Sequence, residues 1–273
     1  MSFRSCLVLV ITLVVSIISI SCGAKSGDVA VSNTGNSTPS TIGTPVVKPA
    51  DDGTIPSGTG TEKEKPAAGK ANVQGKALYN GQPAVGVEVK LCQKFSQYMG
   101  GCTGETFTAK TDAAGEYHFK DVAPGMYEGL NVRVFDTKFY VFATSGIVAA
   151  AKYNLVADKT YFAPDTNLFK NDLKVVSPKA AAKVAAEAIA VKWDAYPDAA
   201  YYKLGVYGDS SSGAETIYDY VNKRVDGIEF TLDKPLKAGS YSVKIEAYNP
   251  QDIRLAQSSS DMKFTVNGAA AAK

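Results

Sequence analysis

The stretch ANVQGKALYNGQPAVGVEVKL, residues 71–91, decides the fold class. Alternating positions lie on both sides of a tight-turn sequence, Asn80-Gly81-Gln82-Pro83. These positions are Val73, Gly75, Ala77 and Tyr79 before the turn and Val85, Val87, Val89 and Leu91 after it. Two alternating runs separated by a turn are typical of a β-hairpin. We therefore expect antiparallel β-structure from Ala71 onward.

Further turn signals follow at regular intervals. The segment Thr111–Gly115 joins Phe107–Lys110 to Tyr117–Phe119, and Pro124-Gly125 precedes Tyr127–Phe135. Short strands at this spacing are typical of an all-β sandwich. Within the first of these turns, Asp112 is interpreted as a turn cap, because the alternating oxygen ligands and late Glu of a calcium loop are absent.

These motifs resemble the carboxypeptidase regulatory-like domain, a prealbumin-like sandwich. The resemblance rests on four segments, which are Gly75–Leu78, Gln82–Val89, Thr111–Phe119 and Val122–Tyr127. It covers residues 71–142, and a closing strand at Thr166–Phe169 extends the predicted domain to residues 71–173. The motifs suggest core positions for Tyr117, Phe119 and Tyr127. The resemblance implies a fold and not peptidase activity, because the chain lacks the His-rich zinc ligands of the peptidase that gives the domain its name.

A second set of strand patterns follows. Ile189, Val191 and Trp193 alternate into a turn at 194–199, and later strand patterns lie at Tyr201–Tyr207, Leu236–Asn249 and Met262–Val266. The Ala-rich run 180–190 favours helix by propensity alone, but its end alternates. Together these segments resemble a fibronectin type III domain over residues 174–267, with a tail at 268–273. The predicted fold class is all-β, with two tandem β-sandwich domains behind a disordered N-terminal tether.

The N-terminus has the parts of an export signal. Arg4 precedes the apolar segment Leu7–Val15, and small residues lead to Cys22. This arrangement resembles a bacterial lipoprotein signal over residues 1–21, which implies that Cys22 is acylated and anchors the protein. The alternatives are an ordinary secreted protein or a transmembrane anchor. Gly23 after the cysteine favours the outer membrane or cell surface by analogy.

Residues 22–70 are predicted to be a disordered linker. Beyond Cys22 they contain no aromatic residue and their few valines are scattered without period, so they are not expected to bury enough apolar surface to become ordered. A flexible coil of this length spans roughly 40 Å.

Four cysteines occur in the chain. With Cys6 in the signal and Cys22 at the lipid site, Cys92 and Cys102 remain, and export to an oxidising compartment favours a disulfide between them. The alternative is a zinc site, for which a chain with one histidine offers too few ligands. We expect no metal and no cofactor.

The net charge and the histidine content argue against nucleic-acid binding and against catalysis. The formal net charge is +2 without a basic block, which makes nucleic acid an unlikely partner. The single histidine, His118, sits in an alternating strand and is interpreted as a packed or solvent-edge residue rather than a general base. Asp209 and Glu215 are interpreted as solvated loop charges rather than glycosidase carboxylates. The sequence thus predicts a non-enzymatic protein without catalytic residues.

Two function classes remain. One is a surface-exposed or periplasmic lipoprotein whose sandwiches interact with a protein or glycan of the envelope or of a host. The other is carbohydrate binding, with Tyr218 and Tyr220 on one predicted strand face as candidate ligand contacts and Tyr201 and Tyr202 nearby. The alternative for these tyrosines is that they pack the core or close strand edges.

Overall fold

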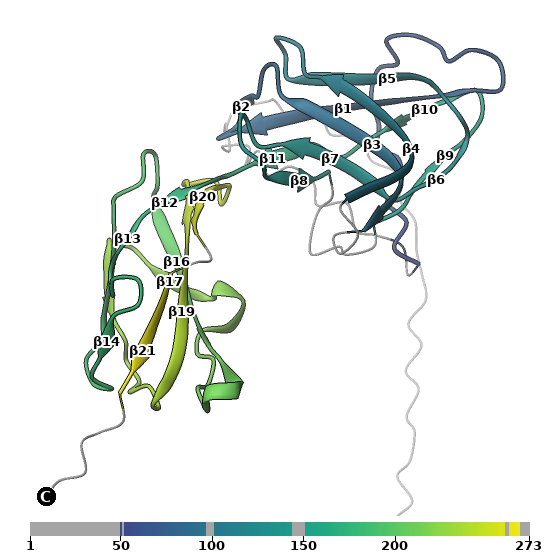
Figure 1. Cartoon of the computed structure of the whole chain (residues 1–273). Coiled ribbons are helices and arrows are strands. Elements are labelled where there is room, and N and C mark those ends of the chain that lie inside the picture. The colour runs from purple at the N-terminus through teal and green to yellow at the C-terminus, as the bar shows by residue number, and fades with distance from the viewer. Residues whose placement is uncertain (1–49, 51, 97–100, 144–150, 260–261, 268–273) are drawn as a thin grey trace, which may run out of the picture. The chain divides into compact units, whose positions relative to one another are not determined.

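The computed structural model describes residues 50, 52–96, 101–143, 151–259 and 262–267 (Figure 1). The predicted signal peptide, Cys22 and the tail 268–273 lie outside these ranges. The described residues form strands and two short 3-10 turns, and among them no helix is long and apolar enough to cross a membrane. The chain folds as two β-sandwiches, each with its own buried apolar cluster, which confirms the predicted fold class.

The first sandwich is built around strand β1 (Ala71–Tyr79). Its antiparallel neighbours are β2 (Gln82–Pro83) and β5 (Glu116–Val122), and its parallel neighbours are β10 (Lys159–Phe162) and β11 (Thr166–Leu168). The strand predicted at 166–169 therefore exists and joins the same sheet as the decisive stretch.

The opposing sheet of the first sandwich has the strand order β4-β3-β7-β8. Its members are β3 (Glu88–Ser96), β4 (Gly101–Lys110), β7 (Gly129–Arg133) and β8 (Tyr140–Phe142). A small separate pair is formed by β6 (Gly125–Tyr127) and β9 (Tyr153–Leu155).

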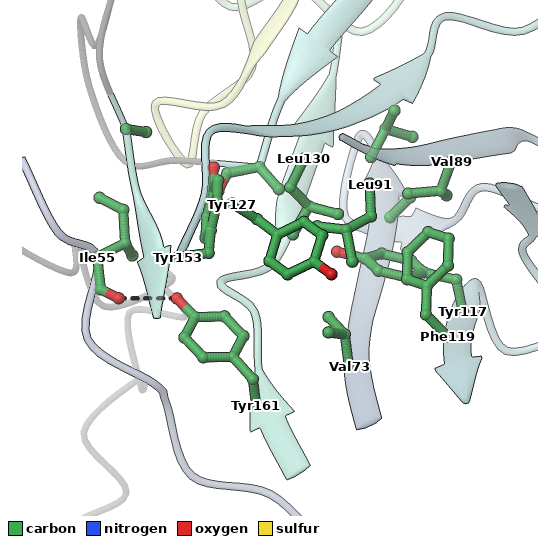
Figure 2. Close-up of a cluster of buried hydrophobic side chains, with 14 of the residues drawn as sticks. Ile55, Val73, Val89, Leu91, Tyr117, Phe119, Tyr127, Leu130, Tyr153 and Tyr161 are labelled. Carbon is green, nitrogen blue, oxygen red and sulfur yellow. Dashed lines mark hydrogen bonds between the residues drawn. The ribbon is translucent and has the colours of Figure 1, made fainter. Parts of the chain in front are cut away.

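The core of the first sandwich lies between these sheets (Figure 2). Val73, Tyr117 and Phe119 extend from the β1 sheet, and Val89, Leu91 and Leu130 from the β3 sheet. All six side chains are at most 3% exposed. The core positions expected for Tyr117 and Phe119 are confirmed, as is that of Tyr127, whose hydroxyl donates to the carbonyl of Ala123 at 3.0 Å.

The predicted hairpin is only partly right. The turn forms, with Asn80 and Gly81 both at positive φ, but only Gln82–Pro83 pairs with β1. The chain then leaves the sheet, and residues from Glu88 onward pair with β4 and β7 instead. Thr111 holds this crossing, because its hydroxyl donates to the carbonyl of Ala84 at 2.6 Å and accepts from the amide of Val87 at 2.9 Å.

The turn at 111–115 forms as predicted. One carboxylate oxygen of Asp112 accepts from the amides of Ala114 and Glu116, both at 2.9 Å, so Asp112 caps the turn. Gly115 has φ +74°, and a Cβ there would lie 2.6 Å from the carbonyl oxygen of Ala77. Only glycine fits this combination of conformation and close approach.

Part of the predicted linker is ordered. Residues 52–64, here called the N-terminal strap, lie against the first sandwich. Ile55 is 1% exposed in the core, its amide donates to the carbonyl of Lys152 at 2.8 Å, and its carbonyl accepts from the Tyr161 hydroxyl at 2.9 Å (Figure 2). Gln74 accepts from the amide of Lys63 at 3.1 Å and donates to the carbonyl of Thr61 at 3.2 Å. Side chains of the sheet thus replace the hydrogen bonds that a polar segment otherwise makes with water.

The second sandwich packs a small sheet against a larger one. The small sheet has the order β13-β15-β18, and the larger one has β12-β20-β19-β16-β17 with β21 and β14 attached. The strands are β12 (Lys170–Leu173), β13 (Val175–Ser177), β14 (Lys183–Val184), β15 (Ala190–Trp193), β16 (Tyr201–Gly208), β17 (Lys223–Val225), β18 (Glu229–Thr231), β19 (Gly239–Tyr248), β20 (Arg254–Ser258) and β21 (Lys263–Val266). The Ala-rich run carries β14 and no helix.

The strand pairing moves the predicted boundary between the sandwiches. β12 pairs with β20, so Lys170–Leu173 belongs to the second sandwich and not to residues 71–173 as predicted. Leu173 is part of the second buried cluster. The change from one core to the other falls at Phe169, because Leu168 is the last residue in the first cluster.

Two aromatic residues organise the second core. Trp193 is 2% exposed, and its ring lies 5.4 Å from that of Tyr202 with an edge contact. Tyr241 is 2% exposed and donates from its hydroxyl to the carbonyl of Lys237 at 3.0 Å. A tyrosine that reaches back to the backbone at a strand corner is a hallmark of immunoglobulin-like sandwiches.

Glu246 provides a pH-dependent contact in the second sandwich. The residue is 6% exposed, and its carboxylate accepts from Arg254 at 2.6 Å and from the Tyr248 hydroxyl at 2.7 Å. Burial would raise the pKa of Glu246, but the charge of Arg254 and the hydrogen bond from Tyr248 outweigh it and hold the pKa below the ordinary 4.5. The stabilising contribution is therefore present above the unfolded pKa and is lost as pH falls through the folded one.

We predict that Glu246→Gln lowers the free energy of unfolding by about 1–3 kcal/mol at pH 7, because Arg254 loses its charged partner. The variant should also lose less stability than the wild type between about pH 5 and pH 3. Urea unfolding at several pH values measures both effects. Glu229→Gln, at an exposed pair with Lys192, is the control and should change stability by at most about 0.5 kcal/mol. An unchanged acid profile in Glu246→Gln would contradict the prediction.

Candidate functional site

The strongest candidate site is a pocket on the outer face of the β3 sheet. Because side chains alternate along a strand, Val89 and Leu91 enter the core while Lys90 between them faces outward. Outward residues of β3, β7 and β8 surround a cavity of about 730 Å³. This volume is within the range of small-molecule sites. The cavity is lined by Lys90, Phe95, Gly101, Cys102, Asn131, Lys138, Phe139, Tyr140 and Phe142.

Aromatic rings form much of the pocket. The rings of Phe95 and Phe142 meet edge to face at 4.9 Å. Phe139 and Tyr140 are 54% and 37% exposed, which is unusual for large apolar side chains. Phe95 lies close over Gly129, where a Cβ would come within 3.1 Å of the Phe95 Cβ. Because Gly129 has no side chain, Phe95 can pack directly against the backbone of β7.

Charged neighbours fix the orientation of Tyr140. Its hydroxyl donates to Glu88 at 2.9 Å, and the ammonium of Lys90 lies 5.3 Å from its ring centroid. The hydrogen bond from Tyr140 lowers the pKa of Glu88 more than burial raises it, and Lys90, at 3.4 Å from Glu88, lowers it further. Glu88 is thus ionised at neutral pH and holds both Tyr140 and Lys90.

Asn131 contributes a buried amide to the wall of the pocket. The residue is 3% exposed, and its Nδ2 donates to the Sγ of Cys92 at 3.8 Å, but its Oδ1 has no hydrogen-bond partner in the structure. Leaving a buried acceptor unpaired costs about 1–3 kcal/mol.

The pocket borders a disulfide. Cys92 and Cys102 are bonded, with their Cα atoms 5.4 Å apart, and Cys102 lines the cavity. The bond joins β3 to β4 where the register between these strands shifts. It therefore fixes the strand ends that carry Phe95 and Gly101.

We predict that replacing both Cys92 and Cys102 by alanine lowers the free energy of unfolding of the first sandwich by about 2.8 kcal/mol, since the bond closes a short loop. Calorimetry of the full chain measures this by comparing the double variant with the wild type, and the wild type with and without a reductant. The transition of the second sandwich, which contains neither cysteine, is the internal control. A reductant that shifts both transitions equally, or neither, would speak against a local role.

The predicted ligand contacts Tyr218 and Tyr220 do not lie on a strand face, which corrects the prediction. Both are at the 3-10 turn η2 (Asp219–Val221) and have positive φ. Tyr218 packs against Phe230 at 6.1 Å, and burial together with its bond to Asp233 raises its pKa to about 12. Tyr220 is 80% exposed. The two rings therefore form no shared sugar-stacking surface.

Tyr201 and Tyr202 are also excluded from such a surface. Both are 4% exposed. Tyr201 stacks on Tyr248 at 5.2 Å, and Tyr202 packs on Trp193. The alternative that these tyrosines pack the core and close strand edges is the correct one.

His118 lies in a different groove, on the outer face of the β1 sheet beside the N-terminal strap. Gln74, Lys63 and Glu116 line this groove with it. Burial lowers the pKa of His118, and nearby Lys63 lowers it further. Lys63 forms a salt bridge with Glu116. The described residues contain no group of three or more His, Cys, Asp or Glu side chains placed to hold a metal ion.

Sequence reasoning missed the aromatic pocket. The signal was present in the run Lys138-Phe139-Tyr140-Val141-Phe142, which places three aromatic residues within five positions. Such a run reads equally well as a buried strand, and its exposure depends on β8 being at the edge of its sheet. The partners Phe95 and Asn131 are distant in sequence and had no signal of their own.

Comparisons with known proteins do not assign the chain to a family. No protein-family model and no curated protein matches the sequence. Among solved structures, the chain is similar to fibronectin(III)-like modules of CbhA from Clostridium thermocellum, with 16% identity over 72% of this chain and 90% of that one and a TM-score of 0.25. It is also similar to BcpA, the major pilin subunit of Bacillus cereus, with 13% identity over 73% and 69% and a TM-score of 0.27. At these scores the likenesses carry no argument about function.

Proposed function

We propose that this protein is a lipid-anchored, non-enzymatic binding protein of the bacterial envelope, and that the pocket on the β3 sheet binds carbohydrate. The observation that carries the binding proposal is an open cavity lined by partly exposed aromatic rings, with the side chain of Asn131 in its wall. Exposed rings such as Tyr140 offer flat apolar surfaces to the C–H faces of a sugar. The side-chain amide of Asn131 adds a polar group to the wall of the cavity.

The anchor is proposed from the N-terminal sequence. Acylation at Cys22 would hold the protein at a membrane, with the outer membrane or cell surface favoured over the inner membrane. The proposal contains no catalysis, because the chain has one histidine and the described residues that line the pocket include no Ser, His, Asp or Glu that could act as nucleophile or base.

The binding proposal is tested on a glycan array with the full-length protein in detergent. We expect binding to a subset of glycans that falls at least tenfold in Tyr140→Ala, because the exposed ring loses its stacking surface while the core is untouched. Tyr220→Ala, which removes an exposed ring elsewhere, is the matched control and should bind as the wild type does. Glycan binding that is lost in Tyr220→Ala and kept in Tyr140→Ala would place the site elsewhere.

The anchor is tested separately. We predict that Cys22→Ser abolishes incorporation of labelled fatty acid, because the thiol is the attachment chemistry of the signal. Labelling in a bacterial host followed by detergent phase separation measures this. A Cys6→Ser variant, altered within the signal core, should retain the label. Label that persists on Cys22→Ser would show that residues 1–21 are not a lipoprotein signal.

A further inference from the structure

We propose that the pocket selects an anionic sugar, one whose ring carries a carboxylate or another single acidic group. This inference rests on the proposed carbohydrate function and names the ligand class of the same site. It comes from the charges at the pocket, because the described residues that line the cavity include two lysines and no Asp or Glu.

The two lysines differ in what they have available for a ligand. Lys90 lies 3.4 Å from Glu88 and over the Tyr140 ring, so its charge is already compensated. Lys138 is exposed and forms no salt bridge with any described residue. Lys138 therefore adds to the lining of the cavity a positive charge that no described carboxylate pairs with, next in sequence to the exposed Phe139.

The remaining polar group of the pocket calls for a different chemistry. Asn131 lines the cavity with a side-chain amide, which pairs with a polar group such as a hydroxyl rather than with a hydrocarbon chain. A fatty acid offers a carboxylate but no donor along its chain. A neutral sugar offers hydroxyls but no partner for Lys138. An acidic sugar satisfies both groups and presents its C–H face to Tyr140.

The geometry also limits the size of the effect. Lys138 is solvent-exposed, and exposed ion pairs contribute about 0.2–1 kcal/mol. Removing the pair should therefore weaken binding by at most about fivefold, since 1.4 kcal/mol is tenfold. The aromatic contacts should supply the larger share of the affinity.

The test is titration calorimetry of the full-length protein in detergent with trigalacturonate and with its methyl ester, which keeps the ring and removes the charge. We expect the ester to bind about two- to fivefold more weakly. Lys138→Gln should weaken the acid by the same factor and leave the ester unchanged. Lys138→Arg should retain most of the preference, and Lys179→Gln, an exposed lysine in the second sandwich, should have no effect.

The outcomes separate this inference from the proposed function. Equal binding of acid and ester, both lost in Tyr140→Ala, would overturn the charge selectivity and keep the sugar site. No binding of either probe or of any array glycan would overturn both. If 6-sulfated trigalactose binds as well as trigalacturonate and also depends on Lys138, the inference holds and the recognised feature is the negative charge.

Discussion

Replacing Trp193 by alanine is expected to unfold the second sandwich under conditions in which the first remains folded. The side chain is 2% exposed among Val191, Tyr202 and Leu204, and its removal leaves a cavity the size of an indole. Large-to-small changes of this kind cost about 3–5 kcal/mol. A domain of this size has about 5–15 kcal/mol in total. The indole nitrogen has no hydrogen-bond partner among the described residues, so the expected cost comes from lost packing.

The measurement uses the fact that Trp193 is the single tryptophan of the chain. In the wild type its fluorescence reports the unfolding of the second sandwich alone, and calorimetry reports both sandwiches. In Trp193→Ala the calorimetric transition of the second sandwich should move to lower temperature or disappear. Trp193→Phe, which keeps a ring against Tyr202, should cost less than the alanine variant. Two transitions that shift together would show that the sandwiches unfold as one unit.

The sequence predicted those features that local patterns determine. Trp193 could be assigned to a buried strand because it alternates with Val191 and Ile189, and Asp112 could be assigned to a turn because its side chain caps amides two and four residues away. The predicted hairpin was too long, because the pattern of alternation continues past the residues that pair with β1. Val85 continues the alternation but is 59% exposed, since alternation does not reveal which sheet a strand enters.

The candidate site depended on contacts that sequence alone does not reveal. Tyr218 and Tyr220 have the two-residue spacing of a strand face, yet their positive φ values place them in a turn. The pocket on the β3 sheet depends on contacts between different strands, which are those of Phe95 with Phe142 and of Asn131 with Cys92. Such pairs become visible only when the sheet order is known.

Polar composition also hid the N-terminal strap. Residues 52–64 read as part of a disordered linker because Ile55 is an isolated apolar residue among Gly, Ser, Thr, Pro, Lys and Glu. The segment is held by one deeply buried side chain and by hydrogen bonds from Gln74 and Tyr161. Strap docking shortens the part of the predicted linker 22–70 that is left to separate the first sandwich from the proposed lipid anchor. A soluble fragment that began at Ala71 would also lack a piece of the first core.

Ile55→Asp is therefore expected to release the strap from the first sandwich. Burying an isoleucine is worth about 1.5–3 kcal/mol, and an unpaired carboxylate in the same place costs several more. Because the strap can leave the core, the loss of stability is limited to the free energy of its docking, which we place at about 3–5 kcal/mol. Ile55→Val keeps most of the contact and should cost about 0.5–1.5 kcal/mol.

Limited trypsin digestion distinguishes release of the strap from unfolding of the sandwich. In the wild type the Lys63 amide is bound by Gln74 and its ammonium by Glu116, so cleavage after Lys63 should be slow. In Ile55→Asp the same bond should be cut early while the rest of the first sandwich resists. Lys110, at the end of β4, provides an internal reference whose rate should not change. Equal cleavage after Lys63 in the wild type and in Ile55→Asp would show that Ile55 does not hold the strap, and the predicted linker would then extend to residue 70 after all.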